Sequence, residues 1–230
     1  GLPERPVPPL GYVITWSVKD LIDMYSRKVT VVKDGKATKV DAMSGLEEIT
    51  FPGVGKLEGF YTDGLRTLLY TLKGAKEMWE KSLRCPGHAG KIEVLKNLGF
   101  FSEEPVKIRD FKVVPRELTT RLFEKELKRP EVPDIVVMLV KVTGVEKGGN
   151  VMYTYQMLDR YDQRKRVTAM GRTTGYTTSV MAQFVADGAI QEKGIFPPEK
   201  VGMNGELYQK YSDALRKRGM VIEEVRKKID

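Results

Sequence analysis

The chain has 230 residues, enough for one domain with a sizeable buried core, and no apolar run approaches the roughly 18 residues that cross a membrane. Its single cysteine, Cys85, excludes an internal disulfide, and its single histidine, His88, leaves too few ligands for a closed zinc site. The net charge of +8 is spread among interspersed acidic residues, which indicates a solvated, thermophile-like surface rather than a nucleic-acid-binding patch. We expect a metal-free cytoplasmic protein.

The N-terminal quarter of the sequence predicts a connector, a helix and a hairpin. Residues 1–11 contain four prolines between two glycines, which favours an extended interdomain connector. Ser17 is a suitable N-cap for a helix whose apolar residues recur at i, i+3, i+4 and i+7. Residues 29–33 and 36–40 are rich in strand formers and flank Asp34-Gly35, a typical hairpin turn.

Alternating strands and helices are predicted next. Residues 49–61 suggest two short strands around Pro52-Gly53, after which Thr62 should cap a helix with a leucine stripe. Residues 78–83 read as a strand, and Pro86-Gly87 separates them from a helix that ends at Gly99.

The second half of the sequence predicts the sheet's core. Pro115 should open a helix, and residues 135–142 form an apolar run typical of a central strand covered on both faces, paired antiparallel with residues 151–158. A helix is expected from Thr173 to Gly188. We divide the chain into the connector, a substrate-binding and dimerisation domain over 12–203, and a charged helical tail over 204–230.

Residues with chemical potential gather between Glu58 and His88. The sequence contains no G-x-G-x-x-G unit, P-loop or nucleophile elbow, so any nucleotide must be bound chiefly elsewhere. The stretches 61–66 and 82–88 both fall at predicted strand-to-helix junctions. Such junctions place side chains in crevices beside helix N-termini, where anionic groups are favoured.

Short motifs in a fixed order run along nearly the whole chain. They are Gly1-Leu2-Pro3, Thr62-Asp63-Gly64, Leu83-Arg84-x-Pro-Gly-His88, Leu98-Gly99-Phe100-Phe101, Arg172-Thr173-Thr174-Gly175 and Ile195-Phe196-Pro197-Pro198-Glu199. In this set and order, the chain resembles lysine 6-dehydrogenase and the saccharopine dehydrogenases. The resemblance implies an α+β substrate domain like the C-terminal domain of glyceraldehyde-phosphate dehydrogenase, without the N-terminal Rossmann domain. Its mixed, largely antiparallel sheet would carry helices on one face and pair subunits into a homodimer through the other.

The resemblance also suggests a substrate site. It implies that Arg84 holds the substrate's α-carboxylate, for which a guanidinium fork is well suited, whereas a salt bridge is the structural alternative. This chain has Cys85 after the arginine, where an aromatic residue is common in the family, so the pocket wall could be smaller. Asp63 could attract the substrate's ammonium or serve the first turn of its helix, and Tyr61 could hydrogen-bond substrate or belong to the core.

Two further sites have open roles. His88 could act as general acid or base near pH 7 or stabilise the turn that precedes its helix. Thr173 and Thr174 resemble a segment that returns toward the cofactor domain and could contact the nucleotide, or they could cap a helix. Cys85 lacks a paired base and is not expected to be a nucleophile.

The activity that the resemblance implies is oxidation of L-lysine at its ε-carbon to the semialdehyde, with NAD or NADP as cofactor. Saccharopine or carboxynorspermidine dehydrogenase is the alternative within the class. A non-catalytic dimerisation module and a basic nucleic-acid binder are alternatives from other classes. Because the dinucleotide-binding domain is expected to be separate, these 230 residues by themselves should be inactive.

Overall fold

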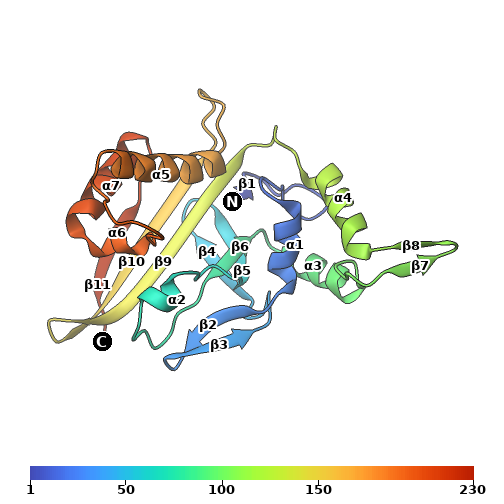
Figure 1. Cartoon of the computed structure of the whole chain (residues 1–230), viewed down its shortest axis with the longest axis horizontal. Helices are drawn as coiled ribbons and strands as arrows, with labels where there is room; N and C mark the ends of the chain where they lie inside the picture. Colours follow the sequence, from blue (N-terminus) through green and yellow to red (C-terminus); the bar gives the residue numbers. More distant parts are fainter. The chain divides into compact units, whose positions relative to one another are not determined.

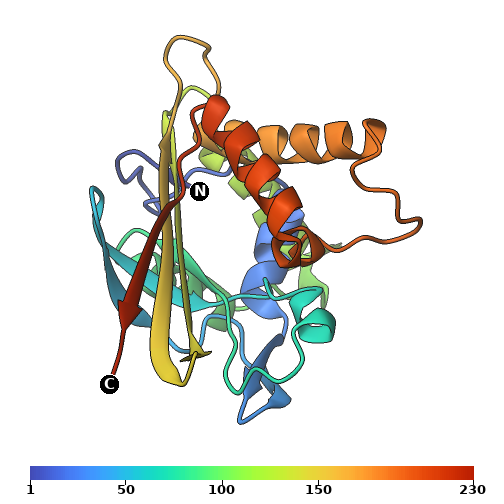
Figure 2. The same ribbon diagram turned by 90° about the vertical axis from the view of Figure 1, so that its left-hand side faces the viewer.

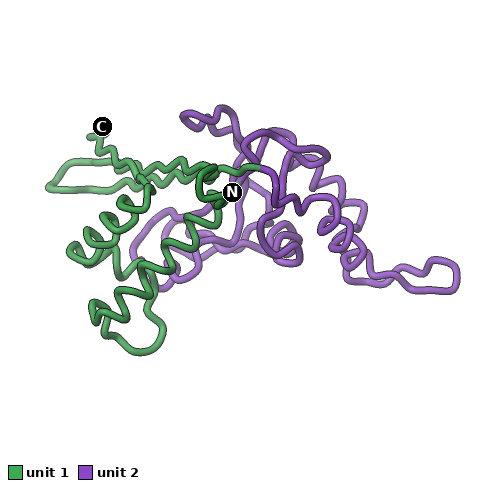
Figure 3. The backbone as a smooth tube through the Cα atoms, turned by 90° about the horizontal axis from the view of Figure 1, so that it is seen from above, with its two compact units in different colours: residues 1, 133–230 green, residues 2–132 purple.

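The computed structural model describes residues 1–230, which divide into two compact units. The N-terminal unit comprises residues 2–132, and the C-terminal unit comprises residues 133–230 with Gly1; Figure 3 draws them in purple and green. Both contain helices and antiparallel strand pairs (Figure 1), which confirms the predicted α+β fold. No helix is both long and apolar enough to pass through a lipid bilayer.

The N-terminal unit is built from short elements. Its strands are β1 (Leu2–Pro3), β2 (Val29–Lys33), β3 (Lys36–Val40), β4 (Glu47–Phe51), β5 (Gly55–Tyr61), β6 (Lys81–Arg84), β7 (Val106–Ile108) and β8 (Phe111–Val113). Its helices are α1 (Val18–Ser26), α2 (Leu68–Thr71), α3 (His88–Asn97) and α4 (Pro115–Leu127).

Helix α1 begins where the sequence places its cap. The Ser17 hydroxyl accepts a hydrogen bond from the Asp20 amide at 3.3 Å, which satisfies one of the free N–H groups of the first turn. The predicted apolar face is buried and joins a core that also takes in residues of β5, α3 and α4. That core comprises Leu10, Tyr12, Ile14, Val18, Leu21, Ile22, Tyr25, Phe60, Ala89, Ile92, Phe101, Phe123 and Leu127.

The hairpins of this unit follow their turn residues. Asp34 and Gly35 adopt φ values of 48° and 74°, which the tight turn between β2 and β3 requires. Strands β4, β5 and β6 form a three-stranded antiparallel sheet with β5 in the centre. Pro115 is the first residue of α4, as predicted.

The helix predicted from Thr62 is wrong in start and length. Helix α2 covers only Leu68–Thr71, and the residues before it form turns, with Arg66 at a φ of 48°. The Thr62 hydroxyl donates to the Glu80 carboxylate instead of capping a helix. A side-chain hydrogen bond to a distant partner has therefore replaced the local one that the sequence suggested. The strand predicted from residue 78 begins only at Lys81.

The C-terminal unit is a sheet with helices packed on it. Its strands are β9 (Asp134–Glu146), β10 (Gly149–Arg160) and β11 (Glu223–Lys228), and its helices are α5 (Ala169–Ala186), α6 (Glu199–Met203) and α7 (Gly205–Lys217). Strand β10 pairs antiparallel with β9 over its full length and with β11 on its other side. Helices α5 and α7 lie on the same side of β9 and β10 (Figure 2), where Val180 and Leu215 pack with Met157.

Three predictions for this unit need correction. Helix α5 begins at Ala169, four residues before Thr173, because Thr168 caps it by accepting from the Gly171 amide. The apolar run of β9 is not covered on both faces throughout, since Val140 and Val142 are 41% and 52% exposed. The tail is helical in α7 but extended in β11, because residues 223–228 pair with β10. The domain boundaries at residues 11 and 203 stay a prediction.

Candidate active site

A pocket of about 450 Å³ lies in the N-terminal unit between α1, the segment after β5 and the start of β6. This volume is within the usual range for small-molecule sites. The pocket contains the Thr62-Asp63-Gly64 motif and part of the stretch that leads to His88. Its lining residues are Trp16, Asp20, Met24, Arg27, Thr62, Asp63, Gly64, Arg66, Glu80 and Ser82.

Glu80 is held against the wall of this pocket. Side chains alternate along an extended strand, so Ser82 and Arg84 project to the same side of β6, and Glu80, the residue before this strand, meets Ser82 at the Thr62 hydroxyl. The Thr62 hydroxyl donates to Glu80 Oε2 at 2.5 Å and lies 2.8 Å from the Ser82 hydroxyl. Burial raises the pKa of the Glu80 carboxyl, and the hydrogen bond from Thr62 opposes that shift.

Gly64 makes room for this carboxylate. A Cβ atom built on Gly64 would lie 2.6 Å from Glu80 Cδ, closer than real Cβ contacts allow. Thr62 binds the carboxylate and Gly64 permits its approach, so two residues of the motif act on one partner that is 18 residues from Thr62 along the chain.

Asp63, in contrast, is paired with two cations. Its Oδ2 lies 3.3 Å from a terminal nitrogen of Arg66 and 3.9 Å from Arg27 Nε. The Asp63 side chain is 26% exposed. Asp63 therefore lines the pocket, as a substrate-binding role would require, although its carboxylate is already engaged in ion pairs. It does not lie in the first turn of a helix, because α2 begins only at Leu68.

Arg84 lies deeper on the same side of β6 and is only 5% exposed. Its guanidinium carbon is 4.4 Å from the centre of the Tyr12 ring, and Nη1 donates to the Leu83 carbonyl at 2.8 Å. Nε is buried without a hydrogen-bond partner. The guanidinium fork thus has at least one donor, Nε, without a partner in the chain. Binding of the substrate's carboxylate by Arg84 stays a prediction.

His88 is engaged at both ring nitrogens. Nε2 is 2.8 Å from the Tyr25 hydroxyl and Nδ1 is 3.0 Å from the Leu10 carbonyl, with 1% of the residue exposed. Burial, with a contribution from Arg84, lowers the pKa of His88 to about 4, so it is neutral at pH 7. This geometry supports the structural alternative for His88 and gives it no exposed nitrogen for proton transfer.

Tyr61 and Cys85 also lie among structural contacts. The Tyr61 ring packs against the cluster of Val29, Val31 and Ala42, and Lys81 Nζ lies 4.8 Å from its centre. Cys85 is buried, and burial raises the pKa of its thiol, which opposes formation of the nucleophilic thiolate. The core alternative for Tyr61 therefore has direct support.

Thr173 and Thr174 lie in α5, in the C-terminal unit. Their hydroxyls donate to carbonyls one turn earlier, Thr173 to Ala169 at 2.9 Å and Thr174 to Met170 at 2.6 Å. Neither caps the helix, and neither has a free proton for a phosphate. Their oxygens could still accept a hydrogen bond, but a phosphate group needs donors, so these two residues fit a dinucleotide poorly. Their contact with the cofactor stays a prediction.

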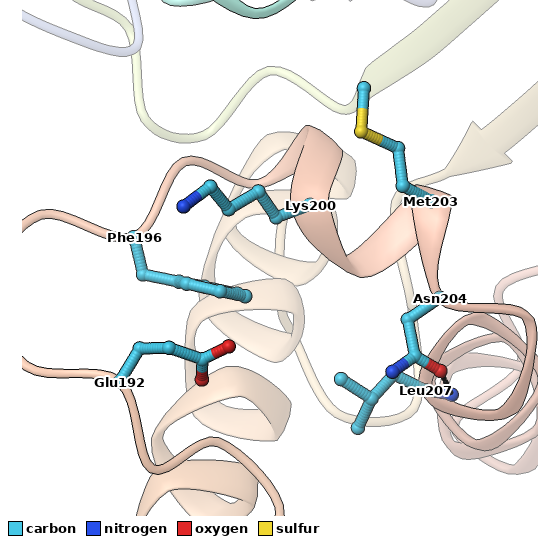
Figure 4. Close-up of a pocket in the computed structure, with 6 residues that line it drawn as sticks. All are labelled: Glu192, Phe196, Lys200, Met203, Asn204 and Leu207. Atoms are coloured by element: carbon cyan, nitrogen blue, oxygen red, sulfur yellow. Dashed lines mark hydrogen bonds between the residues drawn. The ribbon is translucent and has the colours of Figure 1, made fainter.

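A second pocket, of about 220 Å³, lies in the C-terminal unit (Figure 4). It is lined by Glu192, Phe196, Lys200, Met203, Asn204 and Leu207, and it uses the aromatic residue of the Ile195–Glu199 motif. Lys200 Nζ lies 5.5 Å from the Phe196 ring centre. Its volume is below the usual range for ligand sites, which favours the pocket of the N-terminal unit as the candidate.

Sequence reasoning missed Glu80 and Arg27. Arg27 follows α1 and is far from the motifs along the chain, so no local signal marks it. Glu80 could have been found from the sequence, because residues 78–83 were predicted to be extended and every second side chain of an extended segment lies on the same face, here the face of Arg84. In the described residues, 1–230, no group of three or more His, Cys, Asp or Glu side chains is arranged to hold a metal ion.

Comparison with known proteins places the chain in a family. The family model described as saccharopine dehydrogenase C-terminal domain matches residues 1–220, so the chain belongs to that family, as its motifs predicted. Among solved structures, apo histidine-tagged saccharopine dehydrogenase (L-Glu forming) from Saccharomyces cerevisiae is similar at a TM-score of 0.74 and 18% identity. The match covers 98% of this chain and 65% of that one, and at this identity it concerns the fold.

Proposed function

We propose that this member of the saccharopine dehydrogenase C-terminal domain family is the substrate-binding domain of a nicotinamide-dependent amino-acid dehydrogenase of the cytoplasm. The observation that carries the proposal is the pocket of the N-terminal unit, which presents carboxylates and guanidinium groups together. Such a surface is complementary to an amino acid, which carries both charges.

The reaction we propose is oxidative deamination of L-lysine at its ε-carbon to the semialdehyde. NAD or NADP would supply the hydride acceptor, and it would be bound mainly by a separate dinucleotide-binding domain, because this sequence has no G-x-G-x-x-G unit. The part of this chain is to bind and orient the amino acid. Arg84 remains our candidate for the α-carboxylate because its buried Nε has no partner in the chain.

The test is to measure NADH and NADPH formation by the natural protein with L-lysine, and then by its Arg84→Ala variant. Lysine-dependent reduction of either nucleotide is expected, with a Michaelis constant for lysine raised tenfold or more in the variant, as loss of a bidentate contact implies. An unchanged constant would remove Arg84 from the site. Failure to reduce either nucleotide with any amino acid would favour a non-catalytic dimerisation module.

Saccharopine is the second candidate substrate, because the family model that matches carries its name. Carboxynorspermidine is a third, and both molecules are longer than lysine. Comparing turnover of the three compounds under the same conditions decides among them. We also propose a homodimer that pairs through the helix-free face of the β9–β10–β11 sheet.

A further inference from the structure

The Glu80 carboxylate lines the pocket and has no lysine or arginine nitrogen within salt-bridge distance. Asp63, which also lines the pocket, is paired with Arg27 and Arg66. Glu80 receives one side-chain hydrogen bond, from Thr62 to Oε2, and this leaves Oε1 available. Arg84 and Arg66 act on this carboxylate from beyond salt-bridge distance, and a half-buried carboxylate gains from a cation in direct contact.

The surroundings of Glu80 suit a primary ammonium group. The hydroxyls of Thr62 and Ser82 stand beside the carboxylate and offer acceptor lone pairs, and a primary ammonium has three N–H donors to distribute. Trp16 contributes an indole ring to the lining of the same pocket, and aromatic faces attract cations. An anionic ligand group placed beside Glu80 would instead be repelled by its carboxylate.

We propose, on the basis of the function proposed above, that Glu80 binds the amine at the end of the substrate's side chain and so selects diamino acids. An α-ammonium would be a poor ligand here, because it would bring the adjacent α-carboxylate close to the Glu80 carboxylate. An amine that is separated from its carboxylate by several methylenes avoids this repulsion. Glu80 therefore acts as a specificity-determining residue.

Three probes that differ in their amines test the assignment by calorimetry: L-lysine, 6-aminohexanoate, which lacks the α-amine, and L-norleucine, which lacks the side-chain amine. In the natural protein, Glu80→Gln keeps the shape of the side chain and its hydrogen bond from Thr62. We expect this variant to bind lysine and 6-aminohexanoate at least tenfold more weakly and norleucine with unchanged affinity. The matched control is Glu48→Gln, an exposed carboxylate on β4 that pairs with Lys56 at 2.9 Å, which should change none of the three affinities.

Two results would overturn the assignment: equal affinity of wild type and Glu80→Gln for lysine, or equal weakening of all three probes, which would indicate a damaged pocket. Urea unfolding of both variants shows whether the fold is kept. Because calorimetry measures binding without turnover, it tests the role of Glu80 separately from the proposed dehydrogenase activity. Loss of lysine binding in a protein that oxidises no amino acid would contradict only the enzymatic function, and turnover that is indifferent to Glu80→Gln would contradict only the role of Glu80.

Discussion

The Tyr25 hydroxyl lies 2.8 Å from His88 Nε2 and joins α1 to the start of α3 across 63 residues of sequence. The Leu10 carbonyl occupies the opposite nitrogen at 3.0 Å, so the proton of the neutral imidazole is on Nδ1 and Nε2 accepts from Tyr25. The ring is also in edge contact with Tyr12, 5.5 Å between centres. His88, at the start of α3, thus holds α1 and the N-terminal segment 1–11 together through the two nitrogens of a neutral ring.

This arrangement predicts an acid-sensitive stability. An unfolded histidine takes up a proton near pH 6.5, whereas His88 in the folded protein has a pKa of about 4. Between these values the unfolded state binds more protons, so the free energy of unfolding falls as the pH falls, by about 3 kcal/mol in total from this residue. Urea unfolding at several pH values between 4 and 7, done for the protein and for His88→Gln, measures it. The variant should lose less stability over this window, and parallel curves would contradict the prediction.

Arg172 is predicted to stabilise the C-terminal unit as a buried cation. Its Nε lies 3.4 Å from Asp159 Oδ2 and its Nη1 3.3 Å from Asp162 Oδ2, with side chains 10%, 9% and 17% exposed. Arg172→Met would leave the Asp159 carboxylate buried without a counterion, at a cost of about 3–5 kcal/mol in urea unfolding.

The matched control is Arg216→Met. Arg216 pairs with Asp213 at 3.7 Å on the surface of α7, where its side chain is 65% exposed, and exposed pairs contribute about 0–1 kcal/mol. Similar losses in the two variants would mean that burial does not decide the contribution of Arg172.

Elements that depend on neighbouring residues were predictable from the sequence. Ser17 caps α1 three residues from its partner, Asp34 and Gly35 adopt the positive φ values that their hairpin turn needs, and Pro115 opens α4. The long β9–β10 pair follows from two strongly apolar runs. In each case the physical cause lies within a few residues of the element.

Features that depend on distant partners were not predictable. Thr62 was expected to cap a helix, but its partner is Glu80, the residue before β6. His88 stood out as the sole imidazole, yet nothing near it in sequence reveals that Tyr25 and the Leu10 carbonyl occupy both nitrogens. Strand β11 is highly charged and looked helical, and only its pairing with β10 makes it extended. Tertiary contacts outweighed local preference at all three places.

Subunit pairing through the sheet predicts that a charge on its helix-free face separates the subunits. Val225 in β11 lies on that face opposite Thr154 and is 55% exposed. Val225→Asp would bury an unpaired carboxylate in the interface, so sedimentation velocity should show monomers at concentrations where the natural protein is dimeric. Val185→Asp, at a 58% exposed position of α5, is the control and should stay dimeric. A dimeric Val225→Asp would place the interface elsewhere.

Gly64 is predicted to control the position of Glu80. A methyl group at residue 64 would meet Glu80 Cδ at 2.6 Å, so Gly64→Ala should push the carboxylate away from Thr62 and reproduce the weaker lysine binding of Glu80→Gln. The control is Gly90→Ala in α3, where no atom lies within 4 Å of the added methyl group. Because alanine is the better helix former, this control should gain about 0.5–1 kcal/mol of stability in urea unfolding and keep its affinity for lysine. If Gly64→Ala bound lysine as tightly as the natural protein, the cradle formed by Thr62 and Gly64 would have no part in placing Glu80.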